Sequence, residues 1–326
     1  MLVEEIRISS RDEYVTKCRA FVSRLNEDPD SVRKKHGEIL LQTSSGSTGA
    51  PLIVPRLLAD VADVFVRASR YFVRRHGHPP KRIAMLGGIS HFGAAQHLSF
   101  NKVELVAFKA EEKDALRDFS PDVISCYPSI LRELLHDKTL HLPDLKAIKL
   151  GGEKVFPSDV KKAAVKFAGV QLIEQYGSTE MPAVAFREHG QQELRQGFEF
   201  ETQRFRIAEL GSDGWHELLV QDLWQPLLVR AEGYYRTGDE VLVHDGRVID
   251  IRRIGDKSNA YFGAAEKLLA AGCVNVQFDL DADSLMYVGD AELPERVTAN
   301  SRWFKTVNVE KIERLDGSNK LPLVRC

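Results

Sequence analysis

Short apolar runs alternate with segments of helical periodicity through the middle of the chain. Five runs have the length expected of buried strands, at residues 82–86, 104–108, 123–126, 147–150 and 171–174. Apolar residues at helical spacing predict helices near residues 93–98, 113–119, 129–136 and 158–167. A longer helix, residues 58–75, precedes the first run and ends before Gly77. This alternation predicts an α/β fold with a mostly parallel sheet and helices on its faces.

The two ends of the chain follow other patterns. Residues 12–25 carry an apolar stripe that predicts a helix, and residues 39–41 and 52–54 are short strand-like runs. Beyond residue 198, β-like runs separated by Gly and Asp predict a small antiparallel, β-barrel-like region. Those runs are residues 205–208, 217–220, 227–229, 240–243 and 248–251. The last segment mixes helix and strand, so we expect a large domain, residues 1–254, and a small α+β lobe, residues 255–326.

Composition narrows the class of protein. The chain has 326 residues, of which 43% are hydrophobic and 28% charged, and a formal net charge of -2. These proportions are typical of a globular protein, and the chain lacks the net positive charge that would attract nucleic acid. The four cysteines form no CxxC pair, and no apolar run reaches the roughly 20 residues of a membrane span. We therefore expect a cytoplasmic protein with reduced thiols and neither nucleic-acid nor membrane partners.

A polar, glycine-rich segment, SSGSTGAP at residues 44–51, lies between two strand-like runs. Glycines let the backbone approach an anion closely, and hydroxyl and amide groups can surround phosphate oxygens. No Gly-Lys-Ser/Thr follows, so this is not a Walker loop. A flexible Ser/Gly linker is the alternative interpretation, although linkers rarely separate two strands.

Two further motifs follow strands or turns. EQYGSTE, residues 174–180, comes at the carboxyl end of a predicted strand, where open α/β sheets bind ligands. It combines an aromatic ring that can stack on a base with hydroxyl and carboxylate oxygens that suit Mg²⁺. YYRTGD, residues 234–239, ends in a carboxylate that can accept two ribose hydroxyls. An ordinary turn explains either motif equally well when it is considered alone.

The order of these motifs resembles the ANL superfamily of adenylate-forming enzymes, which includes acyl- and aryl-CoA ligases and carrier-protein adenylation domains. Gly151, Gly152 and Glu153 and the segment 249–254, with Arg253, also resemble that family. The resemblance covers roughly residues 41–254. It implies a truncated ANL-type N-terminal domain that activates a carboxylic acid with ATP and Mg²⁺ and passes the acyl group to the thiol of CoA or phosphopantetheine.

The resemblance also assigns roles to single residues. Tyr176 would stack on adenine, Thr179 would contact the α-phosphate, Glu180 would bind Mg²⁺, Asp239 would bind the ribose hydroxyls, and Arg253 would face the ribose or phosphate. The other nucleotide-binding residues would be Ser45, Gly46, Ser47, Thr48, Gly49, Gly152, Glu153, Gly177 and Ser178. His91, Phe92, Gly151 and Met181 would line an apolar pocket for an aryl or medium-length acyl acid.

Several positions depart from the family pattern. Leu52 stands where most members carry a lysine, which favours the phenylacetate-CoA-ligase-like branch. The region before the glycine-rich loop is short, and a homodimer, a partner subunit or a minimised fold would compensate. Residues 310–320 resemble the family's terminal strand and loop, and Lys320 would be its catalytic lysine, with Lys257 as a rival. A solvated charged terminus is the alternative for this segment.

Three functions remain open at this stage. The first is an AMP-forming acid–thiol ligase that uses CoA or an acyl carrier protein. The second is an adenylating enzyme that transfers the acyl group to an amine or a protein side chain. The third is a non-catalytic relative that keeps the nucleotide pocket and acts as a scaffold subunit. Leu52 favours the third function, and intact Thr179, Glu180 and Asp239 argue against it.

Overall fold

The computed structural model describes most of the chain. The described ranges are residues 7–43, 52–87, 103–190, 197–224, 227–279, 281–282, 284–293, 296–297, 307–312 and 323–325. The helix expected near residues 93–98 lies outside them.

A seven-stranded sheet forms the centre of the molecule. Its strands, in spatial order, are β10 (Glu199–Phe200), β9 (Ala185–His189), β8 (Gln171–Tyr176), β7 (Ala147–Gly151), β6 (Val123–Cys126), β4 (Arg82–Leu86) and β5 (Glu104–Phe108). The five strands from β8 to β5 are parallel, and β9 and β10 continue the sheet in antiparallel fashion. The predicted α/β class and mostly parallel sheet are therefore confirmed.

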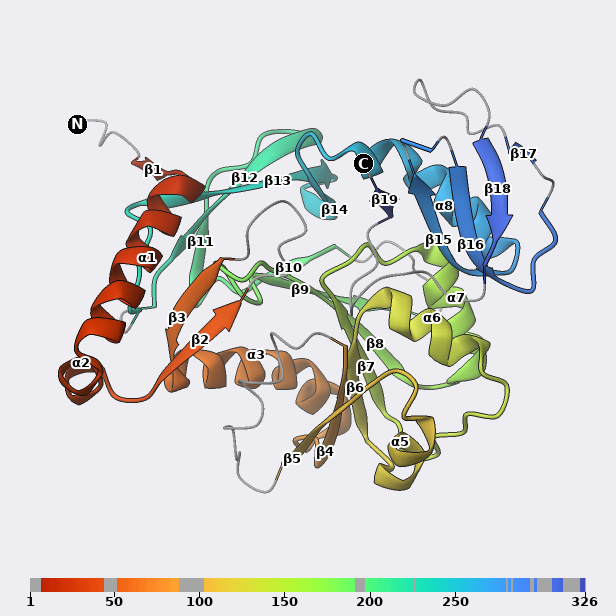
Figure 1. Cartoon of the computed structure of the whole chain (residues 1–326), viewed down its shortest axis with the longest axis horizontal. Helices are drawn as coiled ribbons and strands as arrows, with labels where there is room; N and C mark the ends of the chain where they lie inside the picture. Colours follow the sequence, from red (N-terminus) through yellow and green to blue (C-terminus); the bar gives the residue numbers. More distant parts are fainter. Residues whose placement is uncertain are drawn as a thin grey trace.

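Helices cover both faces of this sheet (Figure 1). On one face, α3 (Leu58–His76) packs Tyr71 and Phe72 against Ile83, Ala147 and Ile173. The other face carries α5 (Lys113–Phe119), α6 (Pro128–His136) and α7 (Pro157–Lys166). Because successive side chains of a strand point to opposite faces, each central strand contributes to both cores.

A second sheet stands beside the first. Its strands are β1 (Ile8–Ser9), β13 (Tyr234–His244), β12 (Gly214–Asp222) and β11 (Phe205–Ile207), and β14 (Arg247–Arg253) also pairs with β13. The helix α1 (Arg11–Glu27), followed by α2 (Pro29–His36), packs on this sheet through Tyr14, Cys18, Phe21 and Leu25. Apart from β1, which pairs with β13 in parallel, this is the predicted small antiparallel region. Residues 227–229, which were expected to form a strand, do not form one. Val229 is buried in the core, and this burial accounts for the apolar run.

A short hairpin flanks the glycine-rich segment. Its strands are β2 (Ile39–Thr43) and β3 (Ile53–Leu57), and Thr43 is paired with Ile53. Residues 44–51 themselves lie outside the described residues, but their two ends are held together by this pairing. The interpretation of residues 44–51 as a phosphate-binding loop stays a prediction.

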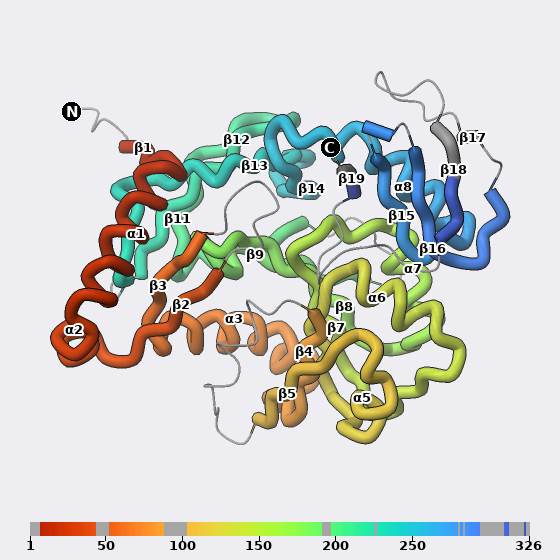
Figure 2. The backbone as a smooth tube through the Cα atoms, viewed as in Figure 1, coloured from red at the N-terminus to blue at the C-terminus, as the bar shows by residue number. Residues whose placement is uncertain are grey.

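The C-terminal part forms a separate α+β unit around its own core, beside α6 and α7 (Figure 2). It contains η1 (Lys257–Tyr261), α8 (Phe262–Ala270), β15 (Cys273–Asp279), β16 (Ser284–Gly289), β17 (Arg296–Val297), β18 (Val307–Lys311) and β19 (Val324–Arg325). It is attached to the central domain by Phe156, which packs in this core, and by polar contacts. Arg132 donates to Asn275 at 3.2 Å, and the Ser158 hydroxyl donates to Glu266 at 2.8 Å. No helix within the described ranges is long and apolar enough to cross a membrane.

Candidate active site

A cavity of about 1470 Å³ opens where the two sheets and the C-terminal unit meet. The carboxyl ends of β7 and β8 and parts of β13 and β14 form its wall, and the ends of the β2–β3 hairpin reach it through Thr43, Leu52 and Ile53. The predicted site residues that line it are Gly151, Gly152, Glu153, Tyr176, Gly177, Ser178, Thr179, Glu180, Asp239 and Arg253. Residues up to about 100 positions apart in sequence thus share one surface.

Tyr176 and Asp239 form one of the contacts between the two sheets. The Tyr176 hydroxyl donates a hydrogen bond of 2.6 Å to Asp239 Oδ2, and Arg253 Nε lies 2.9 Å from Asp239 Oδ1. Arg253 stands opposite Asp239 in the β13–β14 ladder and also donates to the Thr237 carbonyl oxygen at 3.1 Å. Burial and the Asp239 carboxylate raise the pKa of Tyr176 well above its ordinary value. The phenol therefore stays protonated and remains a donor.

The loop after β8 is folded tightly on itself. The Ser178 amide donates to the Met181 carbonyl at 2.9 Å, and the Met181 amide donates to the Ser178 hydroxyl at 3.1 Å. At Gly177 an added Cβ would lie 2.5 Å from the Ala183 nitrogen, so a side chain would force the loop open. This turn presents Thr179 and Glu180 at the cavity wall.

Two buried arginines hold the same loop from outside. Arg56 donates to the carbonyl oxygens of Thr179 and Glu180, at 2.5 and 3.0 Å, and pairs with Asp60. Arg67 donates to the carbonyl oxygens of residues 182 and 183. Sequence reasoning missed these arginines. The signal was an arginine in the short strand β3 with an acidic residue four positions later, at the start of α3.

The carboxylate of Glu180 is engaged by the N-terminal helix. Arg11 Nε donates to Glu180 Oε1 at 3.1 Å, and Arg11 itself is half exposed whereas Glu180 is buried. The sequence prediction had no partner for Glu180 from this helix. Any cation that binds Glu180 must share the carboxylate with Arg11 or displace it.

The glycine pair after β7 lies against an aromatic ring. Gly152 has a φ of +80°, and a Cβ there would lie 2.7 Å from Tyr127 Cε1. Glu153 accepts hydrogen bonds from the Ser129 amide and hydroxyl, at 2.9 and 3.0 Å, which caps the first turn of α6. The predicted nucleotide-binding residue Glu153 therefore also fixes α6.

The remaining predicted site residues fall into two groups. Met181 is buried in the core of the second sheet and does not line the cavity, since the loop turns its side chain inward. The loop residues Ser45, Gly46, Ser47, Thr48 and Gly49, the pocket residues His91 and Phe92, and Lys320 lie outside the described residues. Their roles stay predictions.

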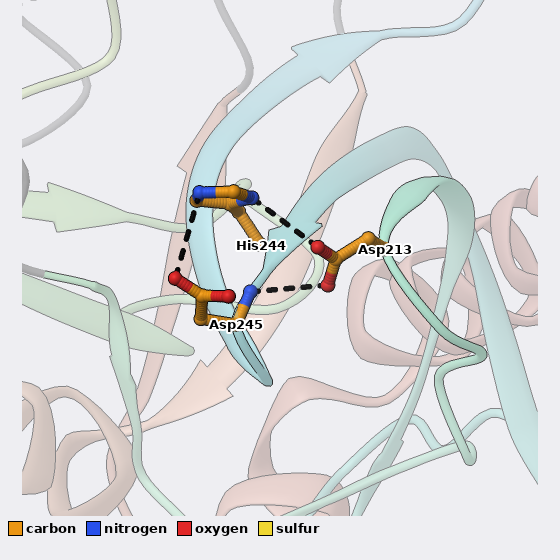
Figure 3. A group of neighbouring side chains, drawn as sticks. All are labelled: Asp213, His244 and Asp245. Atoms are coloured by element: carbon orange, nitrogen blue, oxygen red, sulfur yellow. Dashed lines mark hydrogen bonds and ion pairs between the residues drawn. The ribbon is translucent and has the colours of Figure 1, made fainter.

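An exposed cluster at the β13–β14 turn is a different kind of feature (Figure 3). His244 lies 3.2 Å from an Asp213 carboxylate oxygen and 3.6 Å from one of Asp245, and the Asp245 amide donates to Asp213 at 3.0 Å. All three residues are exposed, and none lines the cavity. Asp245 and Gly246 both have positive φ, as a two-residue hairpin turn requires, so the cluster is explained by the turn.

No model of a protein family matches the chain, and a search of curated proteins finds no match. Among solved structures, the anthranilate CoA ligase AuaEII in complex with anthranoyl-AMP is similar, with a TM-score of 0.61, 13% identity, and coverage of 86% of this chain and 64% of that one. The O-succinylbenzoate coenzyme A synthetase MenE from Bacillus subtilis, in complex with AMP, gives a TM-score of 0.58, 14% identity and coverage of 86% and 67%.

A third structure, IdnL7, gives a TM-score of 0.57 at 14% identity and covers 87% of this chain and 65% of that one. The chain thus spans about two thirds of the length of these proteins. At this identity the likeness concerns the fold, and it leaves the phenylacetate-CoA-ligase-like branch a prediction. This chain therefore has the fold of these solved structures, which is the ANL-type fold that the sequence predicted.

Proposed function

We propose that this chain activates a carboxylic acid with ATP to form an acyl-adenylate and pyrophosphate. The observation that carries the proposal is the cavity in which Tyr176, Thr179, Glu180, Asp239 and Arg253 meet. The ANL-type fold supports it, because two solved structures with this fold, an anthranilate CoA ligase and an O-succinylbenzoate coenzyme A synthetase, are complexes with anthranoyl-AMP and AMP.

The pair Tyr176–Asp239 suits a nucleoside. An ionised carboxylate has about four acceptor positions. Tyr176 and Arg253 each contact one oxygen and so orient this carboxylate at the cavity wall, where the ribose hydroxyls would donate to it. The donated hydrogen bond fixes the phenol ring of Tyr176 at the cavity wall, where its face can stack on a purine.

Mg²⁺ would be held by Glu180 and phosphate oxygens. A carboxylate at the cavity wall is the oxygen ligand that this ion takes. When bound, Mg²⁺ would neutralise part of the negative charge of the phosphates. The Arg11 guanidinium, whose Nε lies 3.1 Å from Glu180 Oε1, orients this carboxylate and would add a second positive charge beside the phosphates.

The chain's own residues then act by position and charge. A carboxylate oxygen of the acid forms a bond to the α-phosphorus, and the bond to the pyrophosphate oxygen breaks, so no protein nucleophile is needed. Thr179 faces this centre from a loop whose carbonyl oxygens are held by Arg56. A donor that is fixed before the reaction stabilises developing charge without reorganisation.

The second half-reaction belongs to the same proposal. A thiol, on CoA or on the phosphopantetheine arm of an acyl carrier protein, would attack the acyl carbonyl carbon and release AMP. Lys320 is proposed to contact the acid and the α-phosphate during the first step. We also propose that the chain acts as a homodimer or with a partner subunit.

A nucleotide-binding scaffold without catalysis is the second candidate. Leu52, which stands at the family's lysine position, is 5% exposed and packs in the core of the second sheet. The β2–β3 hairpin therefore lacks the positive charge of that lysine. In addition, Arg11 pairs with Glu180, the proposed Mg²⁺ ligand, and both features favour a scaffold.

Carboxylate-dependent ATP–pyrophosphate exchange over a panel of acids separates the candidates. Glu180→Gln and Lys320→Ala are each expected to lower exchange by about 100-fold or more, the scale for one preorganised charged group. Glu188→Gln is the matched control, because Glu188 pairs with Arg74 and Arg75 away from the cavity. Absence of exchange with every acid, together with tight ATP binding, would favour the scaffold.

A further inference from the structure

The cavity extends from the adenylate end into a space between α3 and the central sheet. Phe65 and Ala68 of α3 line it on one side. The sheet lines it on the other, with side chains of β6, β7 and β8 that alternate toward α3. They include Val123, Ser125, Ala147, Ile173 and Gln175, none of which carries a charge.

Lys149 interrupts this uncharged surface. It lies on β7 between Ala147 and Gly151, so it shares their face of the sheet, and it lines the cavity. Its amine donates to the Gln175 side-chain oxygen at 3.1 Å. Within the described part of the chain, no carboxylate forms an ion pair with Lys149. The neighbouring Glu174 points to the opposite face, where it is bound by Arg187 and His189.

An ammonium group in such a place is costly. Burial lowers the pKa of Lys149 to about 8, and the nearby Cys126 opposes this shift. The amine is therefore still mostly protonated at neutral pH. A half-buried charge without a counter-charge destabilises a fold, and a lysine with a perturbed pKa in a cleft is a candidate for a functional role.

We propose that the acid bound in this cavity carries a second carboxylate, and that Lys149 and Gln175 bind it. This inference rests on the proposed function, in which the first carboxylate of the acid is the one that reacts with ATP. The amine supplies the positive charge, and the Gln175 amide supplies an NH₂ donor beside it. The apolar wall formed by Phe65, Ala68 and Ile173 would contact the carbon skeleton between the two carboxylates.

The register of the strands gives the separation of the two ends. Gly151, which is paired with Gln175, lies two residues beyond Lys149, which is about 7 Å along the strand. Tyr176, at the adenylate end, directly follows Gln175. A chain of a few carbons or one aromatic ring spans this distance, so short aliphatic or aromatic dicarboxylic acids form the substrate class.

Matched pairs of acids test the proposal. Glutarate and pentanoate share an aliphatic skeleton, and terephthalate and benzoate share a ring. In pyrophosphate exchange, the wild type is expected to prefer the diacid of a pair in kcat/KM by about 10- to 100-fold, the scale for a hydrogen bond to a charged group. Lys149→Met is expected to bring this ratio close to one. Lys146→Met is the control, because Lys146 lies on the chain just before β7, contacts His78 and does not line the cavity.

Binding without ATP gives an independent readout. Glutarate is expected to raise the melting temperature of the wild type and of Lys146→Met more than pentanoate does, and to lose this advantage in Lys149→Met. If Lys149→Met does not fold, Lys149→Gln replaces it in both assays.

The outcomes separate the two proposals. Exchange with monocarboxylic acids, without a preference for diacids that depends on Lys149, would overturn the second-carboxylate site and leave adenylation standing. Stabilisation by glutarate that depends on Lys149, without exchange for any acid, would support the site and overturn adenylation. Neither exchange nor stabilisation would overturn both.

Discussion

Replacement of Arg56 by methionine tests whether the loop of Thr179 and Glu180 is held from behind. Arg56 is 3% exposed, pairs with Asp60, and donates to the carbonyl oxygens of both loop residues. Methionine keeps much of the volume but removes all of these donors. In this variant Asp60 still pairs with Arg204 at 2.6 Å. The Asp60 carboxylate therefore loses one of its two partners but is not left unpaired.

The expected loss of stability follows from these contacts. Removal of one partner of a buried ion pair costs about 3–5 kcal/mol, and the remaining Arg204 contact places Arg56→Met near 3 kcal/mol. With an unfolding entropy of about 2.1 cal/mol/K per residue, the melting temperature should fall by roughly 4–5 °C. We expect pyrophosphate exchange to fall by more than 10-fold at a temperature where the variant is fully folded, because the Thr179 loop is no longer fixed.

Calorimetry and exchange assays measure the two effects. Arg117→Met is the matched control, because Arg117 pairs with Asp114 on the surface of α5, where such pairs contribute about 0–1 kcal/mol. A melting temperature of Arg56→Met within a degree of the wild type, with normal exchange, would refute the reasoning. Low exchange in a variant of unchanged stability would show a positioning role without a structural one.

Three further predictions follow from the cavity. Asp239→Asn should raise the KM for ATP in pyrophosphate exchange by about 10- to 100-fold, because the amide has fewer acceptors for ribose and no charge. Gly152→Ala should destabilise the fold by about 2–4 kcal/mol in urea unfolding, through its positive φ and its contact with Tyr127. The unfolded chain retains the Lys149 proton to higher pH than the folded chain, whose pKa is about 8, so stability should rise from pH 8 to pH 10 by about 1–2 kcal/mol. This rise should be absent in Lys149→Met, as measured by urea unfolding at both pH values.

Local patterns predicted much of the central domain. The runs at residues 82–86, 104–108 and 123–126 coincide with β4, β5 and β6, and the segment 113–119 coincides with α5. Such elements are readable because burial imposes a periodicity on neighbouring residues and because turn residues bound them. Residues 227–229 show the limit of this reasoning. Their apolar character reflects burial in a core, and burial alone does not specify strand pairing.

The chain's own order of residues determined the alternation of strands and helices, the motifs after β8 and in β13, and thereby the ANL-type fold that the structure confirms. Only the tertiary structure decided which groups meet. The Tyr176–Asp239 bond joins residues 63 positions apart, and the Arg11–Glu180 bond joins residues 169 apart. In the sequence, Lys149 is an isolated lysine in an apolar strand. The tertiary structure places it beside Gln175 of β8, in a cavity that α3 also lines. Contacts between distant segments depend on how whole helices and strands pack against one another. A local sequence pattern does not specify which distant residue will become the partner of a side chain.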